Sequence, residues 1–109
     1  MELRVLAVGD VVGASGLKHL EKHLRGVKRL YGVDFCVVNG ENASVVGLTP
    51  QQADAMLDAG ADVITLGNHT WNRREICPYL DDSPYILRPA NFQPSLPGRG
   101  WGIFETKAG

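Results

Sequence analysis

The spacing of apolar residues changes between two periods along the chain, and this change predicts alternating strands and helices. Leu3 to Val8 is an apolar run interrupted only by Arg4, and Gly9-Asp10 ends it. Such a run is typical of a strand buried on both faces. Residues 16–31 then place apolar side chains at helical spacing opposite a face of lysines, arginine and glutamate, so we expect an amphipathic helix that Gly32 ends.

The same alternation continues through the middle of the chain. Val33 to Val38 is a second apolar run, and Ala61 to Leu66 is a third. Between them, Thr49-Pro50-Gln51-Gln52 combines a capping residue, a proline at the first helical position and a glutamine three residues after the cap. This combination predicts a helix that starts here and ends at Gly60, which suits a C-terminal cap.

The last third of the chain has a weaker pattern. A shorter helix is predicted over Arg73 to Leu80, and a last strand near Gly102 to Thr106. The stretch between them contains prolines at positions 84, 89, 94 and 97 and is expected to be irregular.

Strand, helix, strand, helix, strand with short connections is the pattern of parallel βαβ units. We therefore expect an α/β fold, a βαβ-type sheet with flanking helices. In such a sheet the loops after successive strands emerge at the same carboxyl edge, where ligands bind. Those loops are Gly9-Asp10, Asn39-Gly40-Glu41-Asn42 and Gly67-Asn68-His69.

Composition limits the classes of protein that fit. The chain has 109 residues, of which 44% are hydrophobic and 21% charged, as in one globular domain. The chain has 11 lysines and arginines and 12 acidic residues, for a net charge of −1. The overall charge therefore does not indicate binding to nucleic acid or anionic lipid. No signal peptide or membrane-spanning run is present in these residues, and a cytoplasmic protein is expected. Cys36 and Cys77 have no metal-ligand spacing and are expected to be ordinary thiols.

The three loops bring together two carboxylates, two amides and an imidazole. Oxygen-rich sets of this kind suit manganese, iron or magnesium rather than thiol-binding metals. A pair of such cations about 3.5 to 4 Å apart, bridged by one carboxylate, activates phosphoryl groups toward water, and Glu41 is the candidate bridge. Each of these residues taken alone is more often a turn or helix cap. Three consecutive strands that end this way favour a functional site.

Four motifs in this order resemble those of the YmdB-like metallophosphoesterases, a family within the calcineurin-like class. They are Gly9-Asp10-Val11-Val12-Gly13, Asn39-Gly40-Glu41-Asn42-Ala43, Gly67-Asn68-His69-Thr70-Trp71 and Arg88-Pro89-Ala90-Asn91-Phe92. The resemblance implies half of an αββα sandwich and hydrolysis of phosphodiesters, cyclic nucleotides such as cyclic AMP among them. It also implies two divalent metal ions, of iron, manganese or magnesium.

The resemblance assigns a role to each matching residue. Asp10 and Asn42 become ligands of one metal, Asn68 a ligand of the other, and Glu41 the bridge between them. His69 becomes the general acid, since an imidazole with a pKa near 6.5 can donate a proton near neutral pH.

The chain also departs from the family. Family members are much longer, and their second half supplies three further histidine ligands. The only other histidines here, His19 and His23, lie on the predicted first helix and are expected to be solvated or packed. Residues 1–109 are therefore expected to form the amino-terminal part of the domain, with weak metal binding and little hydrolysis as a monomer. The alternative is a catalytically incomplete module that binds a partner or forms a homo-oligomer.

Three further sets of residues have more than one interpretation. Gly9, Gly13 and Gly16 suggest a dinucleotide fingerprint, but the second glycine of that motif is missing. Arg88 could clamp a phosphate or pair with a surface carboxylate. The two tryptophans, Trp71 and Trp101, are expected to be packing residues.

Overall fold

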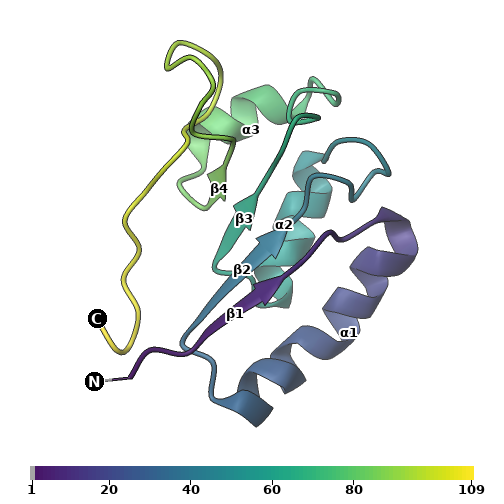
Figure 1. Ribbon diagram of the computed structural model, residues 1–109. Coiled ribbons are helices and arrows are strands. Elements are labelled where there is room, and N and C mark those ends of the chain that lie inside the picture. Colours follow the sequence, from purple (N-terminus) through teal and green to yellow (C-terminus); the bar gives the residue numbers. More distant parts are fainter. Residues whose placement is uncertain (1) are drawn as a thin grey trace.

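The computed structural model describes residues 2–109 and contains four strands and three helices (Figure 1). Their order along the chain is β1 (Val5–Val8), α1 (Gly13–Tyr31), β2 (Phe35–Asn39), α2 (Pro50–Ala59), β3 (Val63–Thr65), α3 (Ile76–Asp82) and β4 (Ile86–Leu87). The α/β class predicted from the sequence is confirmed.

All strands belong to one parallel sheet with the order β1-β2-β3-β4. Val8 is paired with Val38, and Asn39 with Thr65, so the strands end close to the same level. The loops that follow β1, β2 and β3 therefore emerge together at the carboxyl edge of the sheet (Figure 1).

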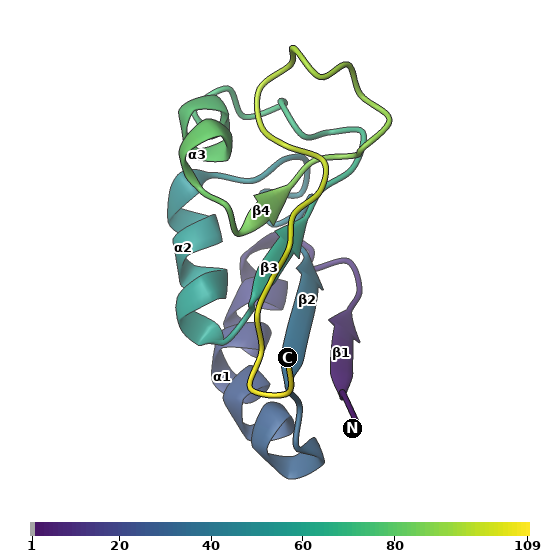
Figure 2. The ribbon, with the colours of Figure 1, turned by 90° about the vertical axis from the view of Figure 1, so that its left-hand side faces the viewer.

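The helices cover only one face of the sheet (Figure 2). Cys36, Val38 and Ile64 point toward the helices and are fully buried, and Met56 of α2 packs among them. On the opposite face the side chain of Val5 is 55% exposed. The prediction that Leu3 to Val8 is buried on both faces is therefore wrong. Because each crossover moves one strand further in the same direction, every helix arrives on the same side.

Helix ends follow the capping signals. Helix α1 begins at Gly13, three residues before the predicted start, and Gly32 ends it in the left-handed conformation (φ 63°). At the start of α2, the Thr49 side chain accepts from the backbone N–H of Gln52, and the Gln52 side chain accepts from that of Thr49. Gly60 ends this helix, as predicted.

The carboxyl-terminal third differs from the prediction. Residues 102–106 are extended but form no strand, so that prediction is wrong. The fourth strand lies instead at Ile86–Leu87, where the carbonyl of Leu87 accepts from the N–H of Leu66. Residues 101–106 run back beside the sheet toward the amino terminus (Figures 1 and 2). They are held by the ring of Phe104, whose centre lies 5.5 Å from that of Phe35.

Both cysteines are free thiols, as predicted: Cys36 is buried and Cys77 is half-buried. Burial raises the pKa of Cys36, which favours the neutral thiol. No helix among residues 2–109 combines the length and the apolar character needed to cross a bilayer.

Candidate functional site

The backbones of the loops after β1 and β2 are joined at the carboxyl edge. The N–H of Val11 donates to the carbonyl of Asn39 over 3.1 Å, and the N–H of Gly13 donates to the carbonyl of Asn42 over 3.0 Å. These two bonds hold the start of α1 against the turn that carries Glu41. From this turn, the Nδ2 of Asn42 reaches the loop after β1 and donates to Oδ1 of the exposed Asp10 over 2.8 Å.

The side chain of Glu41 joins the loop after β2 to the loop after β3. It is only 13% exposed, and its Oε2 accepts from the backbone N–H of His69 over 2.7 Å. The Nδ1 of His69 lies 3.5 Å from the same oxygen and is buried, and no group among residues 2–109 forms a hydrogen bond with it. That distance is long for a hydrogen bond.

Two glycines make room for this arrangement. A Cβ at Gly67 would lie 2.5 Å from Glu41 Oε2, and a Cβ at Gly40 would lie 2.8 Å from the Sδ of Met56. Real Cβ atoms do not approach other atoms so closely. Glycine at these positions lets the turns at the ends of β2 and β3 lie against each other and the core.

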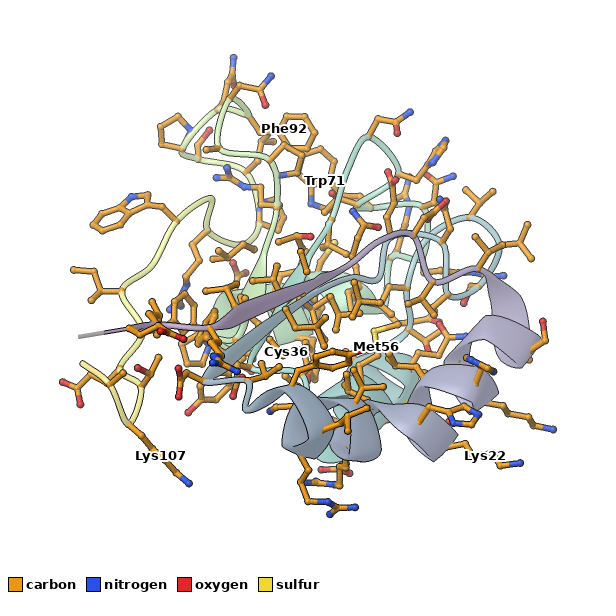
Figure 3. The ribbon with its side chains drawn as sticks, turned by 60° about the horizontal axis from the view of Figure 1, so that its bottom comes forward. Lys22, Cys36, Met56, Trp71, Phe92 and Lys107 are labelled. Carbon is orange, nitrogen blue, oxygen red and sulfur yellow. The ribbon has the colours of Figure 1, made fainter. Side chains whose placement is uncertain are left out.

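The loop that carries His69 has its own supports. Thr70 is buried, and its Oγ1 donates to the carbonyl of Gly67 over 2.5 Å. The ring of Trp71 packs against that of Phe92, with 4.8 Å between their centres (Figure 3). The packing role predicted for Trp71 is confirmed, whereas Trp101 is 73% exposed and the same prediction for it is wrong. The indole Nε1 of Trp71 is buried and has no hydrogen-bond partner in the described part of the chain.

Arg88 supports the loop that contains Phe92. Its side chain is buried, and its guanidinium donates to the carbonyls of Pro97, Pro89 and Gln93 over 3.3, 3.0 and 3.2 Å. Among residues 2–109 no carboxylate forms an ion pair with it, so the predicted alternative of a surface carboxylate partner is wrong. No sequence pattern signals this role, because a guanidinium bound only by backbone carbonyls needs no particular partner residue.

The structure thus brings the predicted site residues together in two groups. Asp10 contacts Asn42, and Glu41 contacts His69. The exposed Asn68 has its Nδ2 3.5 Å from Nε2 of His69. No hydrogen bond in the described part of the chain joins Asp10 to Glu41.

The donor set fits part of the coordination shell of an oxygen-preferring divalent cation. No three His, Cys, Asp or Glu side chains among residues 2–109 gather to hold a metal ion by themselves. At this edge, however, amide oxygens of Asn42 and Asn68 accompany the carboxylates of Asp10 and Glu41, and Mg²⁺ and Mn²⁺ accept both kinds of oxygen.

The other two histidines lie elsewhere. His19 and His23 are exposed on α1, with their ring centres 4.3 Å apart. Their exposure agrees with the predicted solvated side chains.

Hollows of about 520 and 640 Å³ lie at the opposite edge of the sheet, lined by residues such as Phe35, Asp62 and Glu105. None of the residues that line these hollows belongs to the candidate site.

Two curated proteins are similar in sequence to this chain. A 2′,3′-cyclic-nucleotide 2′-phosphodiesterase of Bacillus subtilis (strain 168) is 42% identical over 99 residues, which are 90% of this chain and 38% of the relative. A putative phosphatase/phosphodiesterase of Mycoplasma genitalium is 33% identical over 90 residues, which are 82% of this chain and 32% of the relative. The chain therefore spans well under half the length of these relatives.

Two solved structures share the fold. A hypothetical protein from Thermus thermophilus matches with a TM-score of 0.85 and 35% identity, over 97% of this chain and 41% of that protein. A novel phosphatase from Mycoplasma pneumoniae matches with a TM-score of 0.85 and 29% identity, over 94% of this chain and 38% of that protein. The sequence profile of the YmdB-like proteins matches residues 6–109, and the chain belongs to this family.

Proposed function

We propose that this chain carries the amino-terminal part of a metal-dependent phosphodiesterase site. The observation that supports this most strongly is the position of Glu41. Its largely buried carboxylate lies between the loops after β2 and β3 and accepts from the N–H of His69. A buried carboxylate is costly unless it is paired or binds a cation, and its only hydrogen-bond donor here is one backbone N–H.

Asp10, Glu41, Asn42 and Asn68 are the residues that would hold the cations. Bound divalent ions supply Lewis-acid polarisation of a phosphoryl oxygen. With only these four residues as ligands, the ions keep more water and bind more weakly than in a complete shell. We therefore expect weak metal binding from the isolated chain.

His69 is the proposed general acid. Its Nδ1 faces Glu41, which leaves Nε2 on the outer side of the ring beside Asn68. In this role Nε2–H donates a proton to the alkoxide that leaves the phosphorus. Water forms a new bond to the phosphorus as the P–O bond to the leaving group breaks; the leaving oxygen takes the proton from Nε2, and the attacking water loses one to solvent.

The proposed substrate class is phosphodiesters, with 2′,3′-cyclic nucleotides as the first to test. These substrates are chosen because the similar Bacillus subtilis protein is a 2′,3′-cyclic-nucleotide 2′-phosphodiesterase.

Calorimetric titration with Mn²⁺ tests the metal proposal. Asp10→Asn should weaken binding at least tenfold, because a carboxylate is replaced by a neutral amide. Asp82→Asn is the matched control, since Asp82 is exposed at the end of α3 and should not contribute. Equal affinity in the Asp10 variant and the control would contradict the proposal.

Hydrolysis of 2′,3′-cyclic AMP with Mn²⁺ tests the reaction. His69→Ala should lower the rate more than it lowers metal affinity, whereas Asn68→Ala should lower metal affinity first. If the two variants lose neither rate nor affinity, the site is not catalytic.

A second candidate function is a module that associates with another chain. The observation in its favour is the uncovered face of the sheet, where Val5 is 55% exposed, together with Ile103 at 88%. Metal content and molecular mass from one sample separate the two functions. Two tightly held ions in a dimer would mean that association completes the site, and a dimer without metal would favour a non-catalytic module.

A further inference from the structure

The positive charges of the chain are unevenly distributed. Five of its 11 lysines and arginines lie on α1, whereas α1 carries only one of its 12 acidic residues, Glu21. The overall charge of −1 hides this asymmetry. Charge concentrated on one element indicates an anionic partner more directly than the net charge does.

Four of these cations form a row along the exposed side of the helix. Lys18, Lys22, Arg25 and Arg29 follow one another at intervals of four, three and four residues, and all four are exposed. At about 100° per residue they fall within about 60° of one another, and the row is about 16 Å long. We call these four residues the α1 basic row. Figure 3 shows Lys22 projecting away from Cys36 and Met56, which lie between sheet and helices.

The α1 basic row has no ion pair with a carboxylate of the described chain. Lys28, which lies off the row, pairs with Asp62 over 3.5 Å, and no residue of the row has such a partner among residues 2–109. Arg25 donates to the carbonyl of Asp58. Glu21 lines a hollow together with Arg25 and Asp58, on the side of α1 that faces α2.

The surroundings of the row favour a nucleic acid over a lipid surface. A helix that binds membranes inserts a continuous apolar face. On α1 the side chains of Leu17, Leu20 and Leu24 are buried, and the exposed large apolar side chains are only Leu30 and Tyr31 at its carboxyl end. His19 and His23 lie beside the row with their rings exposed. Cations next to exposed rings are the combination that binds the backbone and bases of single strands.

The row also starts close to the candidate site. Gly13, the first residue of α1, is bonded to Asn42, and Lys18 follows five residues, or about 7.5 Å, further along the helix. A strand whose end lies at the site can therefore extend along α1.

We infer that the α1 basic row binds the phosphate backbone of a single-stranded RNA. The choice of RNA rests on the proposed function, because only a ribose with a 2′-hydroxyl forms a 2′,3′-cyclic phosphate. On this inference the substrate class of the site includes RNA ends, and the row holds the phosphates upstream of the end.

Binding of a fluorescent 12-nucleotide RNA in EDTA tests the inference without any catalysis. Lys18→Gln with Lys22→Gln removes two charges from the row, and Arg74→Gln with Lys107→Gln removes two exposed charges elsewhere. Each phosphate contact contributes about 0.7 to the slope of log affinity against log salt. The row variant should therefore lose about 1.4 from the slope and bind about 20-fold more weakly at 0.1 M salt. The control should bind like the unchanged chain.

The alternative outcomes are distinct. Equal weakening in both variants, or no binding of the RNA at all, would overturn the inference. Binding to vesicles containing phosphatidylserine without binding to RNA would also overturn it, in favour of a lipid surface. Because hydrolysis of 2′,3′-cyclic AMP is measured separately, loss of that activity would count against the proposed function and not against RNA binding.

Discussion

The carboxylate of Glu41 lies directly over the α-carbon of Gly67, so that a methyl group at residue 67 would sit 2.5 Å from Glu41 Oε2. The two residues follow different strands, β2 and β3. Their contact sets how closely the two loops approach, and through it the position of the neighbouring His69.

Gly67→Ala should push Glu41 away from the N–H of His69. We expect a loss of about 1 to 3 kcal/mol in the free energy of unfolding, because the clash involves a largely buried, hydrogen-bonded group. Urea denaturation measures this loss. Gly9→Ala is the control, since a Cβ at Gly9 would meet nothing within 4 Å. Equal stabilities of the two variants would show that Glu41 moves freely.

Arg88→Lys should destabilise the loop after β4. A lysine keeps the charge but cannot reach three carbonyls in different directions, so we expect a loss of about 2 to 3 kcal/mol. Thermal unfolding should show a midpoint lower by about 10 °C or more. Arg99→Lys is the matched control, because Arg99 is exposed and its side chain has one hydrogen bond, to the carbonyl of Asp81. Similar midpoints for both variants would contradict the bracing role of Arg88.

The packed rings of Trp71 and Phe92, whose planes are tilted by 33°, should be energetically coupled. A double-mutant cycle with Trp71→Leu and Phe92→Leu should give a coupling of about 1 kcal/mol. The pair Trp71 and Tyr31 serves as the reference, because Tyr31 lies at the far end of α1 and is exposed. The coupling of that pair should be near zero. A zero value for Trp71 and Phe92 as well would mean that the rings only fill space.

Tyr79 should make stability depend on pH in the alkaline range. Burial, together with the 2.8 Å hydrogen bond to Asp54, raises the pKa of Tyr79 to about 12. The unfolded chain loses this proton near pH 10, whereas the folded chain keeps it. The contribution of the protonated Tyr79 hydroxyl to the stability of the folded chain is therefore fully present below about pH 10 and is lost as the pH rises toward about 12.

The variant Tyr79→Phe isolates this contribution. The difference in unfolding free energy between the unchanged chain and the variant should shrink by about 1 to 2 kcal/mol between about pH 10 and about pH 12. A difference that stays constant across this range would show that the hydroxyl ionises normally in the folded chain.

Features set by local chemistry were predictable from the sequence. The reciprocal bonds of Thr49 and Gln52 satisfy free N–H groups at the start of α2, and Gly32 adopts a left-handed conformation that most other residues avoid. The position of the loops that carry Asp10, Asn42, Glu41 and His69 was predictable too, because parallel strands place successive loops at one edge. Their division into two pairs, Asp10 with Asn42 and Glu41 with His69, was not.

Features set by distant neighbours were not predictable in the same way. Strand β4 has two residues, too few for a pattern, and exists because its backbone pairs with β3. Residues 102–106 have a strand-like sequence but pair with no strand in the described chain. The burial of β1 was overestimated because an apolar run does not reveal which face of a sheet the helices cover.

The order of the strands in space repeats their order along the chain. The loop after β2 therefore has a neighbour on each side: through Asn42 it touches Asp10, and through Glu41 it touches His69. The two outer loops have no such bond to each other among the described residues. A change in the loop after β2 therefore alters the surroundings of both Asp10 and His69.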